Sequence, residues 1–142
     1  MKISARNQFP GVVKTVHKGA VNSDVILDIG DGLEIFANIT NEAVADLRLT
    51  PGRQAVALIK SSFVMLTPDR NVRTSARNHL AGVVAEVIPG SVNCEVKLQL
   101  AGKRIVTAIV TADAIKEMAL VKGSACAAQA APARSQSESC IS

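Results

Sequence analysis

In the first half of the chain, apolar and polar residues alternate within two short segments. Between residues 21 and 29, and again between 33 and 39, most odd-numbered positions are apolar and most even-numbered positions are polar. This period of two predicts half-buried β-strands, because successive side chains of a strand point to opposite faces. The Gly-Asp-Gly sequence at residues 30–32 is typical of a turn, so we expect the two strands to form a β-hairpin.

A short helix and two further strands are predicted after this hairpin. Thr40 precedes the sequence Asn-Glu-Ala-Val-Ala-Asp-Leu, where it is placed to act as an N-cap, and Glu42 lies near the positive end of the helix. The Pro-Gly sequence at residues 51–52 indicates a turn. The largely apolar residues at 55–60 and 63–66 are typical of buried strands.

The whole pattern occurs twice, because the sequence repeats at a shift of 71 residues. Ser-Ala-Arg-Asn at residues 4–7 returns at 75–78, and Gly-Ala-Val-Asn at 19–22 returns as Gly-Ser-Val-Asn at 90–93. Further identities in the same register are Thr40 with Thr111, Ala43 with Ala114, Leu49 with Leu120 and Gly52 with Gly123. Since no gap is needed to hold this register, the chain contains two copies of one module.

Each copy predicts about five short strands and one short helix, so the fold class is mainly β, with two tandem OB-like small barrels. We expect module 1 at residues 1–68 and module 2 at residues 72–126, joined by a turn-like linker. Module 2 lacks a recognisable last strand, because residues 126–131 are mostly small and residues 132–139 contain proline and several serines. Residues 127–142 are therefore predicted to form a flexible tail.

The composition narrows the possible functions. Apolar residues make up 48% of the chain, which is enough for a core, but the three aromatic residues are all phenylalanines. Single-stranded nucleic acid is bound by aromatic platforms in a basic groove, so this composition and a net charge of +4 argue against it. The cysteines Cys94, Cys126 and Cys140 are odd in number and without paired spacing, which indicates reduced thiols rather than a disulfide framework or a zinc site.

No motif of an enzyme is present in the sequence. His17 and His79 do not match each other across the repeat, and neither has a cysteine or carboxylate at ligand spacing. A nucleophile elbow, a Walker loop and an HExxH sequence are all absent, so we expect a protein without catalytic activity. The sequence also has no secretory signal and no apolar run long enough to span a membrane, which favours a cytoplasmic protein without a membrane partner.

The repeated Ser-Ala-Arg-Asn sequence offers a hydroxyl, a guanidinium and an amide within four residues. In an extended segment, Ser4 and Arg6 point to the same side and are able to converge on one small oxyanion. The alternative is a surface strand in which Arg6 pairs with a carboxylate and Asn7 forms a turn. The equivalent residues of the second copy are Ser75, Arg77 and Asn78.

Three further features have both a structural and a functional interpretation. Thr40 and Thr111 are either plain N-caps or, because the first N–H groups of a helix lack partners, members of an anion site. Lys60 ends an apolar strand and is followed by Ser61, so it either extends into solvent or requires an anion. The Gly-Ala-Val-Asn turn either presents backbone N–H groups to an oxyanion or is a turn only.

In combination, these motifs resemble those of a known family. The Ser-Ala-Arg-Asn sequence, the Gly-Ala-Val-Asn turn, the Thr-led helix and residues 57–66 are similar to the Mop family of molybdate- or molybdopterin-binding proteins, also called molbindins. Two copies in one chain resemble its di-Mop, ModG-type members over about residues 1–125. The resemblance implies a homotrimer that holds molybdate, with tungstate as a competitor, at subunit interfaces for cytoplasmic storage or homeostasis.

The resemblance also implies which residues contact the oxyanion. The molybdate-binding residues would be Ser4, Arg6, Asn7, Thr40, Lys60 and Ser61 in copy one and Ser75, Arg77, Asn78 and Thr111 in copy two. A second oxyanion site would use Val21, Asn22, Val92 and Asn93. Ala131 and Pro132 stand where copy one has its Lys-Ser pair, so any site that needs a lysine from copy two should be weak or lost. An oligomeric oxyanion-sensing or interaction module acting in trans is the alternative function.

Overall fold

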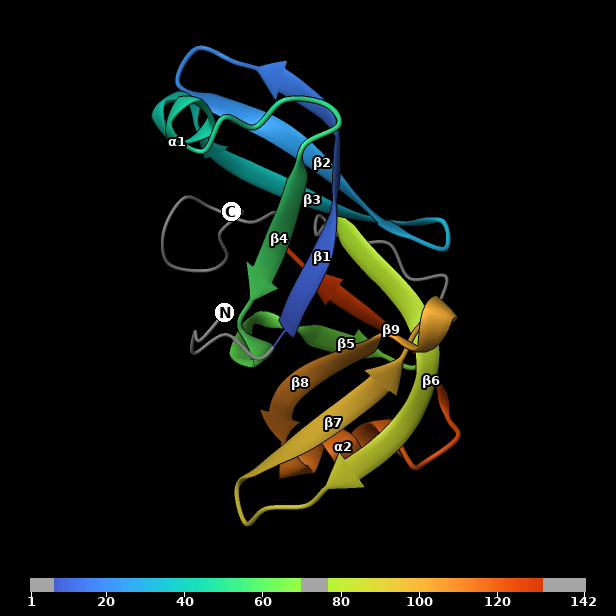
Figure 1. Ribbon diagram of the computed structural model, residues 1–142. Helices are drawn as coiled ribbons and strands as arrows, with labels where there is room; N and C mark the ends of the chain where they lie inside the picture. Colours follow the sequence, from blue (N-terminus) through green and yellow to red (C-terminus); the bar gives the residue numbers. More distant parts are fainter. Residues whose placement is uncertain (1–6, 70–76, 132–142) are drawn as a thin grey trace. The chain divides into compact units, whose positions relative to one another are not determined.

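The first four strands of the chain form one antiparallel sheet (Figure 1). The computed structural model describes residues 7–69 and 77–131. The elements of the first sheet and its helix are β1 (Asn7–Lys18), β2 (Asn22–Gly30), β3 (Leu33–Thr40), α1 (Asn41–Asp46) and β4 (Gln54–Ile59). The strand order is β3-β2-β1-β4. β2 and β3 pair antiparallel along their whole lengths, which confirms the predicted hairpin.

Most of the apolar positions of the alternating sequence pattern are buried positions of this sheet. The apolar side chains of β2 and β3 that face the core are Val25, Leu27, Ile29, Ile35, Ala37 and Ile39. Phe9 and Val13 of β1 and Ala57 and Leu58 of β4 are buried with them. The core is thus almost entirely aliphatic, and its stability comes from removing these side chains from water.

The rest of the described chain forms a second, five-stranded sheet and the short helices that accompany it. Its elements are η1 (Ser61–Phe63), β5 (Met65–Thr67), β6 (Asn78–Ile88), β7 (Asn93–Gln99), η2 (Ala101–Lys103), β8 (Ile105–Thr111), α2 (Ala112–Met118) and β9 (Ala125–Ala130). The order is β5-β9-β6-β7-β8. Because β8 also contacts η1 and β5, the two outer strands approach each other as in a small barrel. The mainly β fold with one short α-helix per copy is confirmed.

The prediction that module 2 lacks its last strand is wrong. β9 pairs with β6 on one edge and with β5 on the other, and the residues that were assigned to a tail, 127–130, lie within it. A strand hydrogen-bonded on both edges does not depend on β-branched side chains. Cys126 and Ala127 are fully buried, so small side chains suit this position in the core. The remainder of the predicted tail, residues 132–142, lies outside the described residues.

The boundary between the modules also differs from the prediction. The described chain divides into two compact units between Lys60 and Ser61, rather than near residue 68. Residues 61–67 belong by sequence to copy one, yet they form η1 and β5 of the second unit, where Met65, Leu66 and Thr67 pair with β9. The last strand of copy one therefore completes the sheet of copy two.

Among the described residues, no helix has both the length and the apolar character needed to cross a membrane. In the same residues, His, Cys, Asp and Glu side chains do not gather in any group of three or more that could hold a metal ion.

Candidate functional site

The predicted threonine and asparagine donors lie side by side at one end of each sheet. Asn22 of β2 is paired with Thr40 of β3, and Asn93 of β7 is paired with Thr111 of β8. Sequence analysis assigned these residues to two different oxyanion sites, whereas the strand register places each asparagine directly across from a threonine. The same pair of polar side chains thus recurs at the same place in both units.

Both threonines act as N-caps, as the sequence predicts. Thr40 Oγ1 accepts a hydrogen bond from the backbone N–H of Ala43 at 3.0 Å, and Thr111 Oγ1 accepts one from Ala114 at 3.1 Å. A hydroxyl oxygen that accepts in this way retains its own proton for donation. Capping and donation to an oxyanion are therefore compatible roles of one side chain.

The Gly-Ala-Val-Asn turn projects an apolar side chain into solvent in both copies. Val21 is 71% exposed and Val92 is 70% exposed, and the asparagines that follow them are exposed as well. The backbone N–H of Asn41 donates to the Val21 carbonyl at 2.8 Å, and Ala112 does the same to Val92 at 2.8 Å. These bonds fix each turn against the start of the following helix.

In copy one the turn is held by additional side chains that sequence analysis did not identify. The Asn41 side-chain amide donates to the Gly19 carbonyl at 2.9 Å, and the buried Ser23 hydroxyl donates to the side-chain oxygen of Asn41. The repeat register places Ala112 and Cys94 at these positions in copy two. A comparison of the two copies, position by position, would have shown this loss of polar groups.

The asparagines of the Ser-Ala-Arg-Asn motifs are buried at the start of β1 and β6. Asn7 is 2% exposed and Asn78 is 1% exposed, and the Asn78 side chain donates to the backbone carbonyl of Ala131 at 3.3 Å. Ser4, Arg6 and Ser75 lie outside the described residues. Arg77 is exposed and comes immediately before β6.

Lys60 lies close to Asn7, the last residue of the Ser-Ala-Arg-Asn motif of copy one. Asn7 is paired with Ile59, the last residue of β4, and the exposed Lys60 follows directly. In the second unit Asn78 is paired with Ala130, and Ala131 follows in place of the lysine. In the second unit, the Ser-Ala-Arg-Asn motif therefore has no lysine at the position equivalent to Lys60. Ser61 is half-buried and begins η1.

Thr40 and Lys60 lie at opposite ends of the first unit. Lys60 is beside the first residue of β1, whereas Thr40 lies beside the turn that follows the last residue, Lys18. At ~3.3 Å per residue, the twelve residues of β1 span roughly 30 Å or more. One tetrahedral ion therefore does not contact Thr40 and Lys60 of the same unit.

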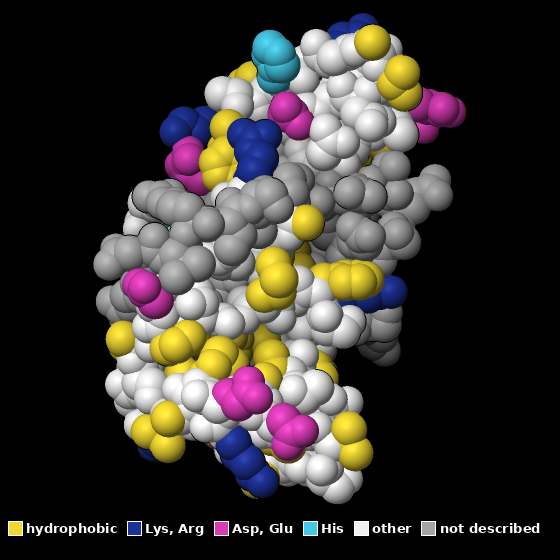
Figure 2. Space-filling view, turned by 180° about the vertical axis from the view of Figure 1, so that it is seen from behind, with side chains coloured by type: hydrophobic (Ala, Val, Ile, Leu, Met, Phe, Trp, Pro, Cys, Tyr) yellow, Lys and Arg dark blue, Asp and Glu magenta, His cyan; other side chains and the backbone are white. Residues whose placement is uncertain are grey.

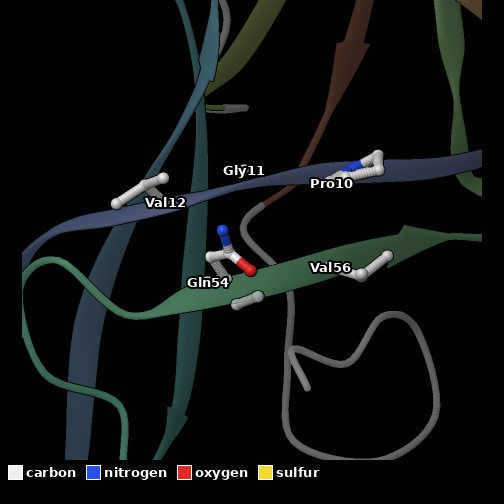
Figure 3. A pocket seen from close by; sticks show the side chains of 6 residues that line it. Pro10, Gly11, Val12, Gln54 and Val56 are labelled. Atoms are coloured by element: carbon white, nitrogen blue, oxygen red, sulfur yellow. The ribbon is translucent and has the colours of Figure 1, made fainter.

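A shallow cavity of about 440 Å³ lies along the pairing of β1 and β4 (Figure 3). It is lined by Pro10, Gly11, Val12, Gln54, Ala55 and Val56, so it offers one amide and no charge. The corresponding pairing in the second unit is that of β6 with β9, where Gly82 lies opposite Cys126. The lining does not suit a dianion, and we do not assign the oxyanion site to this cavity.

The two histidines differ in their surroundings. His17 is exposed, and the half-buried His79 lies with its Nδ1 atom 3.1 Å from the amide nitrogen of Gln129. Farther from the turns, the exposed Lys14 is hydrogen-bonded to Glu34, and this bond and the negative charge of Glu34 raise the pKa of the Lys14 ammonium group.

Comparison with known proteins gives concordant results. The family model described as "TOBE domain" matches residues 3–66 and again 74–135. The molybdenum transport protein ModE of Azotobacter vinelandii is 44% identical over 128 residues, which are 89% of this chain and 47% of that protein. The molybdenum-pterin-binding protein MopA of Rhodobacter capsulatus is 39% identical over 87% of this chain and 47% of its own. The chain thus spans about half the length of these curated relatives.

One solved structure is similar to this chain over nearly the whole length of both proteins. It is a form of the cytoplasmic molybdate-binding protein ModG with molybdate bound, and it superposes with a TM-score of 0.92 at 37% identity. The likeness covers 99% of this chain and 98% of that one, so it includes both units.

Proposed function

We propose that this member of the TOBE-domain family binds molybdate reversibly in the cytoplasm, for storage or homeostasis. The chain has two such domains and is of the di-Mop, ModG type. The observation that carries this proposal is the full-length likeness to molybdate-bound ModG at a TM-score of 0.92. Tungstate, a tetrahedral dianion of nearly the same size, is the expected competitor. The protein makes and breaks no covalent bond, in keeping with relatives that are named as binding and transport proteins.

The chemistry of capture is the placement of donors and cations around a dianion. Hydroxyl and amide donors and an always-charged guanidinium form charge-assisted hydrogen bonds to oxyanions. The proposed binding residues are Ser4, Arg6, Asn7, Thr40, Lys60 and Ser61 of copy one, Ser75, Arg77, Asn78 and Thr111 of copy two, and the turn residues Val21, Asn22, Val92 and Asn93. The burial of Asn7 and Asn78 favours a supporting role for them, in which they hold the strand ends that carry the other donors.

We propose that the binding species is a homotrimer. The separation of Thr40 from Lys60 within one unit supports this, because one ion does not contact both residues of that unit and a further chain would supply the second one. The valines at the tips of both turns also support it, since an exposed apolar side chain repeated at the same position suits a surface that is covered in an assembly.

Nucleic acid is the less favoured partner. On the face shown in Figure 2, the Lys and Arg side chains of the described residues are scattered among acidic and apolar ones rather than arranged in a stripe. Phe9, the aromatic residue of β1, is buried and cannot stack on a base. A module that senses the oxyanion and acts on a partner in trans is the second candidate, favoured by the match to about half of ModE.

Equilibrium dialysis of the purified chain against molybdate, tungstate, sulfate and phosphate tests the proposal, with analysis of bound molybdenum. We expect saturable binding of molybdate and tungstate, and much weaker binding of sulfate and phosphate. Equal binding of all four anions, or none of molybdate, would contradict the proposed function. Sedimentation of the same samples with and without molybdate tests the trimer.

A further inference from the structure

The two Gly-Ala-Val-Asn-type turns differ in how they are held, although both are bonded to the start of the following helix. We propose that Asn41 and Ser23 are positioning residues that prepare the turn of copy one for an oxyanion, so that the two turns bind molybdate with unequal affinity. This inference rests on the proposed function and goes beyond it, because the repeat alone predicts two equivalent turns.

Asn41 donates hydrogen bonds to two of the carbonyl groups of the turn in copy one. Its backbone N–H donates to the Val21 carbonyl at 2.8 Å, and its side-chain amide donates to the Gly19 carbonyl at 2.9 Å. The Ser23 hydroxyl donates to the other side-chain atom of Asn41, its amide oxygen. Since Ser23 is almost fully buried, the Asn41 side chain is anchored to the interior of the unit.

The anchored carbonyls determine where the turn's N–H groups point. In a trans peptide unit, the N–H is directed opposite to the C=O of the same plane. With the Gly19 carbonyl directed at the Asn41 side chain, the N–H group of Ala20 is directed away from Asn41, while the Asn22 carbonyl accepts a hydrogen bond from the Gly19 N–H at 2.9 Å across the turn. Backbone N–H groups held in fixed directions form the kind of concavity that binds oxyanions.

Copy two retains only half of this arrangement. The Ala112 backbone N–H still donates to the Val92 carbonyl at 2.8 Å. The Ala112 side chain has no polar atom, so it cannot fix the peptide between Gly90 and Ser91, and Cys94 stands where Ser23 anchors the asparagine. A turn whose N–H groups become ordered only when the ligand binds has a lower affinity than one that is ordered beforehand.

The two copies supply their own reciprocal variants. Asn41→Ala gives copy one the residue of copy two, and Ala112→Asn together with Cys94→Ser gives copy two the residues of copy one. A matched control is Asn38→Ala, which removes a part-buried asparagine hydrogen bond in the same unit, to Asp24 at 2.8 Å, without touching the turn. Binding is measured by titration calorimetry on the full-length chain with sodium molybdate, and hydrogen exchange of residues 19–22 and 90–93 is measured without it.

We expect Asn41→Ala to weaken the tighter class of turn sites about three- to tenfold, the usual effect of one hydrogen bond. The double variant should strengthen the weaker class by a similar factor, and Asn38→Ala should leave both affinities unchanged. In the ligand-free protein, exchange in residues 19–22 should be slower than in residues 90–93, and Asn41→Ala should remove the difference.

The outcomes separate this inference from the proposed function. Molybdate binding by the wild type with unchanged affinities in both reciprocal variants would overturn the inference and leave the function standing. Failure of the wild type to bind molybdate would overturn the function, and the roles of Asn41 and Ser23 with it. An equal loss of affinity in Asn41→Ala and Asn38→Ala would show general destabilisation and would also overturn the inference.

Discussion

Thr40 has two proposed roles that can be separated by one substitution. Its hydroxyl oxygen caps α1 through the bond from Ala43 at 3.0 Å, and its hydroxyl proton is proposed to donate to molybdate. Aspartate caps a helix as well as threonine does, but it has no proton to donate and carries a negative charge. Thr40→Asp should therefore keep the fold and abolish binding, whereas Thr40→Ala should affect both.

The magnitudes follow from these contacts. Loss of an N-cap costs about 1 kcal/mol, so Thr40→Ala should lower the melting temperature of the first unit by roughly 4–8 °C. Loss of a hydrogen bond to a charged group costs about 1.5–3 kcal/mol, which weakens molybdate binding at that site by about 10- to 100-fold. Thr40→Asp should lose at least as much affinity, through repulsion of the dianion, while its stability stays within about 0.5 kcal/mol of the wild type.

Thermal unfolding followed by circular dichroism measures the first effect, and titration calorimetry with sodium molybdate measures the second. Thr40→Ser, which keeps both the cap and the donor, is the control and should behave as the wild type. If Thr40→Asp binds molybdate with the wild-type affinity, Thr40 is not a ligand and its position opposite Asn22 has only structural meaning. Equal destabilisation of the Asp and Ala variants would instead refute the cap.

Three further predictions concern other elements. Lys60→Ala should weaken molybdate binding by about 1–3 kcal/mol in calorimetry, and Ala131→Lys should strengthen it if the lysine-free end of copy two is a binding site. Ala127→Leu, at a fully buried position of β9, should destabilise the second unit by about 1–3 kcal/mol in urea unfolding, while a residue in a flexible tail would tolerate it. Val21→Asp combined with Val92→Asp should dissociate the proposed trimer in sedimentation and abolish molybdate binding with it. A monomer that still binds molybdate would contradict the shared site.

Local patterns predicted the β2–β3 hairpin and the short helix of copy one, because each depends on residues close in sequence. The buried strand expected at residues 63–66 is wrong in part, since Phe63 ends a 3₁₀ helix and both Phe63 and Met65 are exposed. The alternation from residue 21 to 39 and the N-cap at Thr40 are local signals, and both correspond to observed structure. β9 escaped prediction because its stability comes from pairing with β6 and β5, which lie far away in the sequence, and not from its own alanines. For the same reason the repeat could define two copies without revealing that β5 completes the second unit. The Asn41 contact with Gly19 joins residues 22 positions apart, and no local motif encodes it.

Three differences between the copies fall at or beside the proposed oxyanion-binding residues. Where copy one has Lys60, Asn41 and Ser23, the register gives Ala131, Ala112 and Cys94, so each change removes a cation or a hydrogen-bonding side chain. The helix caps, Thr40 and Thr111, are kept in both copies, as expected for residues that the fold itself requires. Copy two keeps the other proposed donors, Ser75, Arg77 and Thr111, so it should still bind the oxyanion, but more weakly than copy one. Titration calorimetry of the wild-type chain with molybdate should therefore resolve sites of unequal affinity, whereas a single class of equivalent sites would contradict this difference between the copies.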